Sequence, residues 1–240
     1  MRYFAPNSQI PLSPNTGDQD WDCPEAFDMD KLIQTIRTTR EQIEHPSDAV
    51  QRAGGPPGLQ YSLASMWANP PEDTHRLLSP EALDSIRSSA LSRLGVGSIA
   101  EIPFSIILVD GILLFYDSVG GEGSPGEECD AGIFVYANYH TLKQRREARS
   151  GYATKDGIWV DPPGYFDAVV WPGFLKYHRT LVEACPQIAD KTPQPPDDGG
   201  PEEAVRHGDI ALCSSDMPFE RTLRVCVESV IREWDRRQVN

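Results

Sequence analysis

The sequence has little basic charge and no long apolar run, and each shortage excludes a class of protein. Its 22 Lys and Arg residues stand against 36 Asp and Glu residues, which leaves a formal net charge of −14. An acidic surface of this size argues against nucleic acid or an anionic membrane as a partner. No stretch reaches the roughly 20 apolar residues of a membrane span. The first residues, MRYFAPNSQIPLSP, lack the apolar centre of a secretory signal.

Cysteine is also scarce, and its spacing excludes a disulfide framework or a zinc site. The five cysteines contain no C-x-x-C pair; they are Cys23, Cys129, Cys185, Cys213 and Cys226. An odd number of scattered thiols is typical of reduced cysteines, so we expect a protein of the cytoplasm or nucleus. The 240 residues, 39% of them hydrophobic, are enough for one α/β domain with a substantial core.

Apolar periodicity and turn residues predict alternating strands and helices. Asp28 caps a predicted helix over 29–44, and Ser79, Pro80 and Gly95 mark the start and end of another over 79–95. The other expected helices cover 138–150, 165–184 (kinked or interrupted by Pro172) and 218–236. The expected strands cover 104–109, 132–137 and 209–213. This order predicts an α/β fold with a parallel sheet and helices on both faces. The segments 46–78 and 192–206 are predicted to be an irregular insertion and an acidic linker.

One predicted strand ends in an acid, as strands that place a magnesium-binding carboxylate do. Residues 106–117 read IILVDGILLFYD, so an apolar run passes into Asp110 and Gly111. In open α/β sheets, ligands bind beyond the carboxyl ends of the strands, where a carboxylate can hold Mg²⁺. The alternative is an acid that only ends a strand and starts a turn. A phosphate loop of the form G-x-x-x-x-G-K-[ST] is not found in residues 1–105.

Three further stretches can carry chemistry. In 138–152, NYHTLKQRREARSGY, four cationic side chains stand at helical spacing and repel one another unless an anion such as a triphosphate lies between them. The alternative is a solvated basic face. In 151–178, glycines, prolines and aromatics alternate with Asp156, Asp161 and Asp167, which is typical of a lid or of a wall on which a base stacks; the alternative is a packed connection. In QDWDCPEAFD, 19–28, a Trp beside an Asp can hold a sugar or can simply pack the next helix.

Together these stretches resemble the nicotinamide riboside kinases, a branch of the P-loop nucleoside kinases related to uridine kinase. The matching pieces occur in the family's order; they are FAPNSQIP with WDCPEAFDMDKL, IILVDGILLFYD, YHTLKQRREARSGY and WVDPPGYFDAVVWPGFLKYH. The resemblance implies a P-loop NTPase-like sheet with residues 138–165 as the lid. It also implies transfer of the γ-phosphate of ATP to the 5′-hydroxyl of nicotinamide riboside, which gives nicotinamide mononucleotide and requires Mg²⁺.

The resemblance also assigns residues to each ligand. It implies that Asp110 lies on the magnesium side of the site. The ATP-binding residues that it implies are Arg145, Arg149, Tyr152, Ser214, Ser215, Asp216 and Met217. The nucleoside-binding residues that it implies are Phe4, Trp21, Asp22, Arg146 and Tyr152.

The sequence departs from the family at its start. The family's first strand, phosphate loop and first helix have no counterpart here, and the position of its catalytic aspartate falls at Met1. The phosphate loop supplies much of the positioning and charge stabilisation in phosphoryl transfer. We therefore expect residues 1–240 to form a single, incomplete nucleoside-kinase-like domain with essentially no kinase activity. The alternatives are a non-catalytic nucleoside-binding paralogue and a related uridine-type nucleoside kinase.

Overall fold

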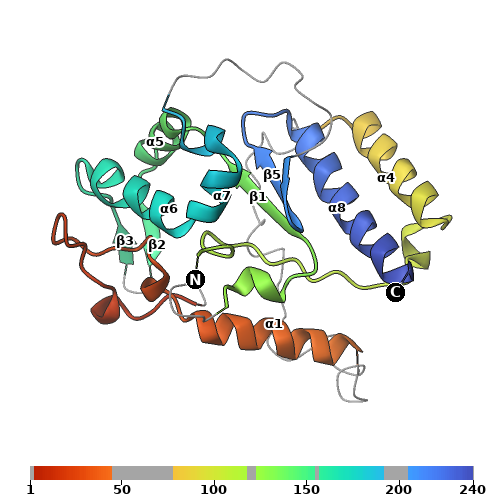
Figure 1. The fold of residues 1–240 in the computed structure, drawn as a ribbon, viewed down its shortest axis with the longest axis horizontal. Coiled ribbons are helices and arrows are strands. Elements are labelled where there is room, and N and C mark those ends of the chain that lie inside the picture. The colour runs from red at the N-terminus through yellow and green to blue at the C-terminus, as the bar shows by residue number, and fades with distance from the viewer. Residues whose placement is uncertain (1–2, 45–77, 118–122, 155–156, 192–204, 240) are drawn as a thin grey trace. The chain divides into compact units, whose positions relative to one another are not determined.

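The computed structural model describes five stretches of the chain, drawn in colour in Figure 1. They are residues 3–44, 78–117, 123–154, 157–191 and 205–239. The predicted insertion, 46–78, and the predicted acidic linker, 192–206, lie outside them except for their last positions. The chain forms two compact units, Met1–Ile33 with Asp110–Asp216 and Gln34–Val109 with Met217–Asn240.

The first unit contains a small mixed sheet. Its strands are β1 (Gly132–Tyr136), β4 (Val205–His207) and β5 (Ile210–Ser214), in the spatial order β1-β5-β4. β1 and β5 run parallel and lie side by side in Figure 1, whereas β4 is antiparallel to β5. The predicted strands over 132–137 and 209–213 are therefore confirmed, as is the mixed α/β class with a parallel pair. The sequence did not predict β4, since three residues reading V-R-H give no alternation to recognise.

The strand predicted over 104–109 is wrong. The segment is irregular, and the side chains of Ile106, Ile107 and Leu108 are 62%, 37% and 89% exposed. A buried parallel strand exists only where neighbouring strands satisfy its backbone groups. Within the five stretches no strand pairs with this segment. Apolar composition alone therefore does not make a strand here.

Helical segments cover part of the sheet in the first unit. The helix predicted over 165–184 is divided into the π-helical turn η6 (Phe166–Val170), α6 (Trp171–Tyr177) and α7 (Arg179–Ala184). Pro172 lies in the first turn of α6, where its missing N–H costs least, and the backbone before it is helical at Val170 and Trp171. The helical backbone breaks instead at His178, which has φ of −122° and ψ of 31° between α6 and α7, so the interruption predicted at Pro172 is wrong in its position. After α7 follows the short turn η7 (Pro186–Ala189). Side chains from these helical segments and the two parallel strands form one buried cluster; they include Phe134, Leu181, Ile188 and Leu212.

The predicted lid contains a helix and a hairpin. α5 (Tyr139–Glu147) confirms the predicted helix over 138–150, and the Asn138 side chain accepts a hydrogen bond from the backbone N–H of Thr141 at 3.0 Å. A hairpin that the sequence did not predict follows, made of β2 (Tyr152–Thr154) and β3 (Gly157–Trp159). Gly151 precedes it with φ of +137°, a conformation that favours glycine.

The N-terminal part of the first unit is irregular. It contains the short turns η1 (Asn7–Gln9) and η2 (Pro24–Ala26), and a third, η5 (Pro125–Glu128), precedes β1. A buried cluster joins the N-terminal segment to more distant parts of the same unit; its members are Ile10, Trp21, Cys23, Ala26, Leu113 and Tyr177.

The second unit is helical. α1 (Met29–Glu44) continues into it, and α4 (Pro80–Leu94), the turn η4 (Ile99–Glu101) and α8 (Phe219–Val239) complete it. α4 and α8 lie side by side in Figure 1, and Arg93 pairs across them with Glu228 and, at 3.2 Å, with Asp235. The three predicted helices are therefore confirmed. The caps are confirmed too, since Ser79 accepts from the N–H of Ala82 and Gly95 has φ of +68°.

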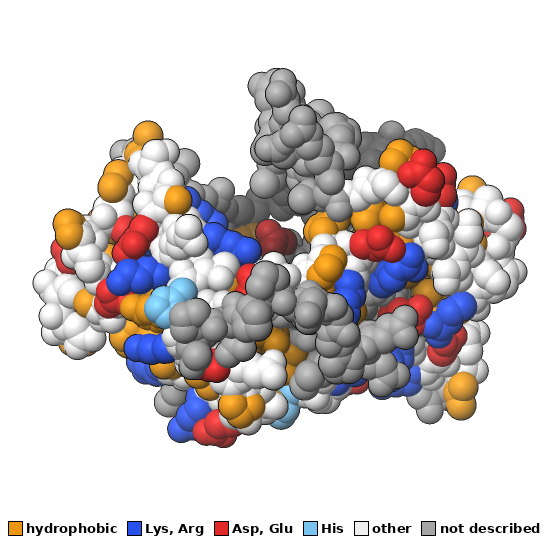
Figure 2. Space-filling model, turned by 90° about the horizontal axis from the view of Figure 1, so that it is seen from above, with side chains coloured by type: hydrophobic (Ala, Val, Ile, Leu, Met, Phe, Trp, Pro, Cys, Tyr) orange, Lys and Arg blue, Asp and Glu red, His pale blue; other side chains and the backbone are white. Residues whose placement is uncertain are grey.

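On the face drawn in Figure 2, Lys and Arg side chains lie among Asp and Glu side chains rather than apart from them. All five cysteines are free thiols. Among the residues drawn in colour, no helix combines the length and the apolar character needed to cross a bilayer.

Candidate functional site

Arg146 of α5 lies between two carboxylates. Its Nη1 and Nη2 donate to the two oxygens of Asp22 at 2.8 and 2.9 Å. Its Nε donates to Asp161 Oδ2 at 2.6 Å, and Nη2 also reaches Asp161 Oδ1 at 3.3 Å. The three side chains are only 15–19% exposed. Paired hydrogen bonds on a planar group fix the orientation of the guanidinium as well as its position.

The charges of this trio favour one kind of ligand. Burial alone would lower the pKa of Arg146, but the hydrogen bonds and charges of Asp161 and Asp22 outweigh it and raise that pKa above its usual value. The arginine therefore stays charged, and two carboxylates with one guanidinium leave one net negative charge. Burial and the nearby charge of Asp22 raise the pKa of Asp20 as well. The site suits a ligand that offers hydroxyl donors or a positive charge.

Aromatic side chains lie next to the trio. The ring centroids of Trp21 and Trp159 are 5.9 Å apart, with 52° between the ring planes. Trp159 Nε1 donates to Asp161 Oδ1 at 2.9 Å, so the same carboxylate contacts the arginine and the indole. Tyr165 holds the loop below, since its hydroxyl accepts from the backbone N–H of Trp21 at 3.2 Å and donates to Gln19 O at 2.7 Å.

Two lid arginines share a tyrosine. The guanidinium carbons of Arg146 and Arg149 lie 5.1 and 5.3 Å from the ring centroid of Tyr152, at cation–π distance. The predicted nucleoside-side residues Trp21, Asp22, Arg146 and Tyr152 are thus brought together. Arg149, predicted on the ATP side, lies at the edge of this group.

The other ATP-side residues gather at the end of β5. Arg145 Nη1 donates to Ser215 Oγ at 2.7 Å, and its Nη2 lies 3.7 Å from Asp216 Oδ1. Ser214, the last residue of β5, accepts from the N–H of Asp216 at 3.2 Å, and Met217 follows in the chain. This is the carboxyl end of a parallel strand, where ligands bind in open α/β sheets.

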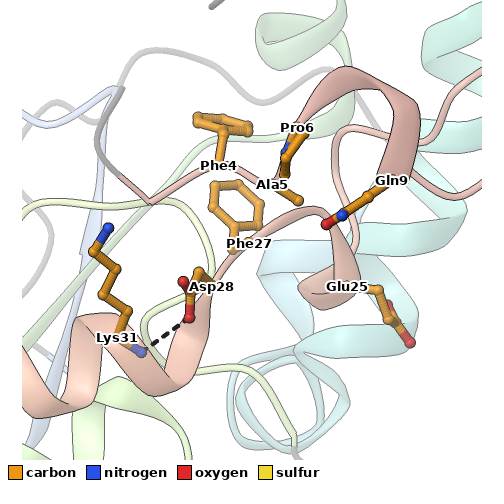
Figure 3. A pocket seen from close by; sticks show the side chains of 8 residues that line it. All are labelled: Phe4, Ala5, Pro6, Gln9, Glu25, Phe27, Asp28 and Lys31. Atoms are coloured by element: carbon orange, nitrogen blue, oxygen red, sulfur yellow. Dashed lines mark hydrogen bonds between the residues drawn. The ribbon is translucent and has the colours of Figure 1, made fainter.

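A cavity of about 300 Å³ lies beside Phe4 (Figure 3). It is lined by Phe4, Ala5, Pro6, Gln9, Glu25, Phe27, Asp28 and Lys31. The Phe4 ring centroid is 4.3 Å from that of Phe27 and 5.8 Å from that of Trp21. Asp28 accepts from the N–H of Lys31 at 3.1 Å, which caps α1 as the sequence predicted. Phe4 is the one predicted nucleoside-side residue in this lining.

Asp110 does not lie in an assembled metal site. It is exposed and follows the irregular segment 104–109, and Met1 lies outside the residues that the structure describes. Within the coloured parts of Figure 1, no group of three or more His, Cys, Asp or Glu side chains is placed to hold a metal ion. Mg²⁺ needs several oxygen ligands in octahedral geometry. Within the described ranges, the side chains around Asp110 therefore do not fit a resident magnesium ion.

Sequence reasoning did not assign three residues of this site to a ligand. Asp161, Trp159 and Tyr165 lie inside the 151–178 segment, for which the sequence predicts a lid, a base-stacking wall or a packed connection without assigning a role to any of the three. The D-P-P-G-Y-F-D run that begins at Asp161 contains a local signal for that residue. A residue before proline is restricted to an extended backbone, which fixes where the Asp161 carboxylate can lie. The hairpin that carries Trp159 gave none.

Comparisons identify similar proteins of known function. The nicotinamide riboside kinase of Schizosaccharomyces pombe is 25% identical over 179 residues, which are 75% of this chain and 65% of the relative. The enzymes of that name from Eremothecium gossypii and Saccharomyces cerevisiae are 27% and 25% identical, over 76% and 75% of this chain and 64% of each relative. The chain thus spans slightly under two thirds of the length of these relatives. No family model and no solved structure matches.

Proposed function

We propose, on the premise that this chain belongs to the nicotinamide riboside kinase family, that the site around Arg146 binds the ribose of nicotinamide riboside. The activity proposed for this family-level function is transfer of the γ-phosphate of ATP to the 5′-hydroxyl, which makes nicotinamide mononucleotide. The observation that carries the proposal is the paired contact of Arg146 with Asp22 beside an aromatic wall.

The chemistry of a ribose matches this pair. Each sugar hydroxyl is both a donor and an acceptor, so one hydroxyl can donate to the Asp22 carboxylate while its oxygen accepts from Arg146. Hydrogen bonds to charged groups are about twice as strong as neutral ones. Asp161 would keep the guanidinium in place while Asp22 turns part of its hydrogen bonding to the ligand.

The ATP side is proposed from the second cluster. Arg145, Ser215 and Asp216 lie at the carboxyl end of β5, and Arg149 projects from the segment after α5. We assign these residues, with Tyr152, Ser214 and Met217, to contacts with ATP. Kinases use ATP as its magnesium complex, so the metal would arrive with the nucleotide.

We assign the sheet to the P-loop NTPase-like class. The parallel β1–β5 pair, with α6 and α7 packed near it, is compatible with the P-loop NTPase-like sheet of a nucleoside kinase. Residues 138–165, which contain α5 and the hairpin, would form the lid over the nucleoside in a single kinase-like domain. Five free thiols favour a reducing compartment such as the cytoplasm or nucleus.

Calorimetric titration of the full 240-residue chain with nicotinamide riboside tests the proposal. We expect one saturable site, and Asp22→Asn should weaken binding about tenfold or more, the value of a charged hydrogen bond. Asp167→Asn is the matched control, because Asp167 pairs with Lys143 at 2.5 Å and accepts from the Tyr139 hydroxyl, and both of these partners lie outside the trio. Absence of nucleoside binding in the wild-type chain would contradict the proposal.

The same titration tests the uridine-type alternative, because uridine that binds as tightly as nicotinamide riboside would favour a uridine-type nucleoside kinase. A separate assay for nicotinamide mononucleotide formed from magnesium-ATP tests the expected lack of kinase activity. Product formed by the 240-residue chain would overturn that expectation and the non-catalytic alternative together.

A further inference from the structure

The aromatic surface at this site belongs to Trp159 more than to Trp21. The Trp21 side chain is only 8% exposed, and the rings of Phe4 and Trp159 lie 5.8 and 5.9 Å from it. An indole covered in this way offers little face to a ligand. Trp159 is half-buried, so part of its side chain stays accessible. Trp21 therefore supports an outer indole.

We propose that Trp159 is a specificity-determining residue that presents its aromatic face to the positively charged pyridine ring of the nucleoside. This inference rests on the proposed function and names the residue that recognises the ring. It assigns Trp21, which the resemblance placed against the ligand, to a supporting position behind Trp159.

Trp159 is held in place from three sides. Its Nε1 donates to Asp161, its ring packs on Trp21, and its ring centroid lies 6.0 Å from that of Tyr165 at 64°. Its strand also pairs with β2, where Trp159 stands opposite Tyr152. A large side chain fixed by packing and one hydrogen bond loses little entropy when it meets a ligand.

The indole is linked to the sugar-binding pair through one side chain. Asp161 contacts both Arg146 and Trp159, so a riboside held by Arg146 and Asp22 carries its ring beside this indole. The pyridine nitrogen of nicotinamide riboside is quaternary, which makes the ring a cation. Trp is the best of the aromatic side chains at attracting a cation over its face. The net negative charge of the trio acts in the same direction.

Two ligands of nearly equal shape and different charge test the proposal. Nicotinamide riboside is a cation, and its 1,4-dihydro form is neutral. In titrations of the full chain, Trp159→Leu should weaken binding of the cation about fivefold to thirtyfold, the range of a partly desolvated cation–π contact. The same substitution should change binding of the neutral form much less. Trp159→Phe keeps a ring and should give a smaller loss for the cation.

Ile158→Ala is the matched control. Ile158 is the neighbouring residue on β3, its side chain is 76% exposed, and successive strand residues point to opposite faces. This variant should bind both ligands as the wild type does. Should Trp159→Leu fail to fold, judged by circular dichroism, the comparison of Trp159→Phe with the wild type decides the question.

Each outcome supports or overturns the assignment. An equal loss for both ligands would show that Trp159 is only structural, and unchanged binding of the cation would show that it makes no contact. A wild-type chain that binds the two forms equally keeps the proposed function and overturns this inference. A wild-type chain that binds neither riboside overturns both.

Discussion

Replacing Arg146 by methionine removes the positive charge that joins Asp22 to Asp161. Methionine keeps most of the apolar length of the side chain, so the change mainly leaves two carboxylates that have lost the guanidinium between them, and Asp161 keeps its hydrogen bond from Trp159. Breaking a fully buried ion pair on one side costs about 3–5 kcal/mol, whereas exposed pairs contribute about 0–1 kcal/mol. At 15–19% exposure the trio is close to the buried limit, and we expect a loss of about 2–4 kcal/mol.

Urea unfolding followed by tryptophan fluorescence measures this loss, because Trp21 and Trp159 lie beside the substituted residue.

Arg145→Met is the control for this experiment. Arg145 is the adjacent residue of α5, but its side chain is 52% exposed and its partners lie at the end of β5. Its replacement should change the unfolding free energy by no more than about 0.5 kcal/mol. A loss for Arg146→Met below about 1 kcal/mol, or one no larger than that of Arg145→Met, would refute the reasoning.

Three further predictions concern single positions. Burial lowers the pKa of His178 below its ordinary 6.5, so the folded state binds the proton more weakly than the unfolded state does. The free energy of unfolding should therefore fall as the pH drops below about 6.5. Urea unfolding at about pH 7.5 and about pH 5.5 should show that His178→Leu removes this contribution to the pH dependence. Ser79→Ala should lower the free energy of unfolding by about 1 kcal/mol, because it removes the cap of α4. Ser88→Ala, at an exposed position of the same helix, should not lower it in the same assay. Gly151→Ala would place a Cβ 2.7 Å from Ile158 Cγ2 at a φ of +137°, and calorimetry should show weaker nucleoside binding as the hairpin shifts.

Local signals in the sequence determined much of the helical structure. Asp28, Ser79 and Gly95 act as caps through hydrogen bonds and backbone geometry that involve only near neighbours in the chain. For this reason the helix positions could be predicted before any packing was known. The strands β1 and β5 could also be predicted, since their residues are apolar and lie between clear turns.

Tertiary contacts decided which apolar segments became strands and which side chains met at the site, because these contacts join residues far apart in the chain. Residues 104–109 have the composition of a strand but no partner strand among the described residues, so they remain irregular. Asp22 and Arg146 were both predicted to bind the nucleoside, yet only the folded chain shows that they contact each other across 124 positions. Asp161 and Trp159 gained their proposed roles only through that contact, since no pattern within their own segment distinguishes a residue beside a ligand from one that packs a loop.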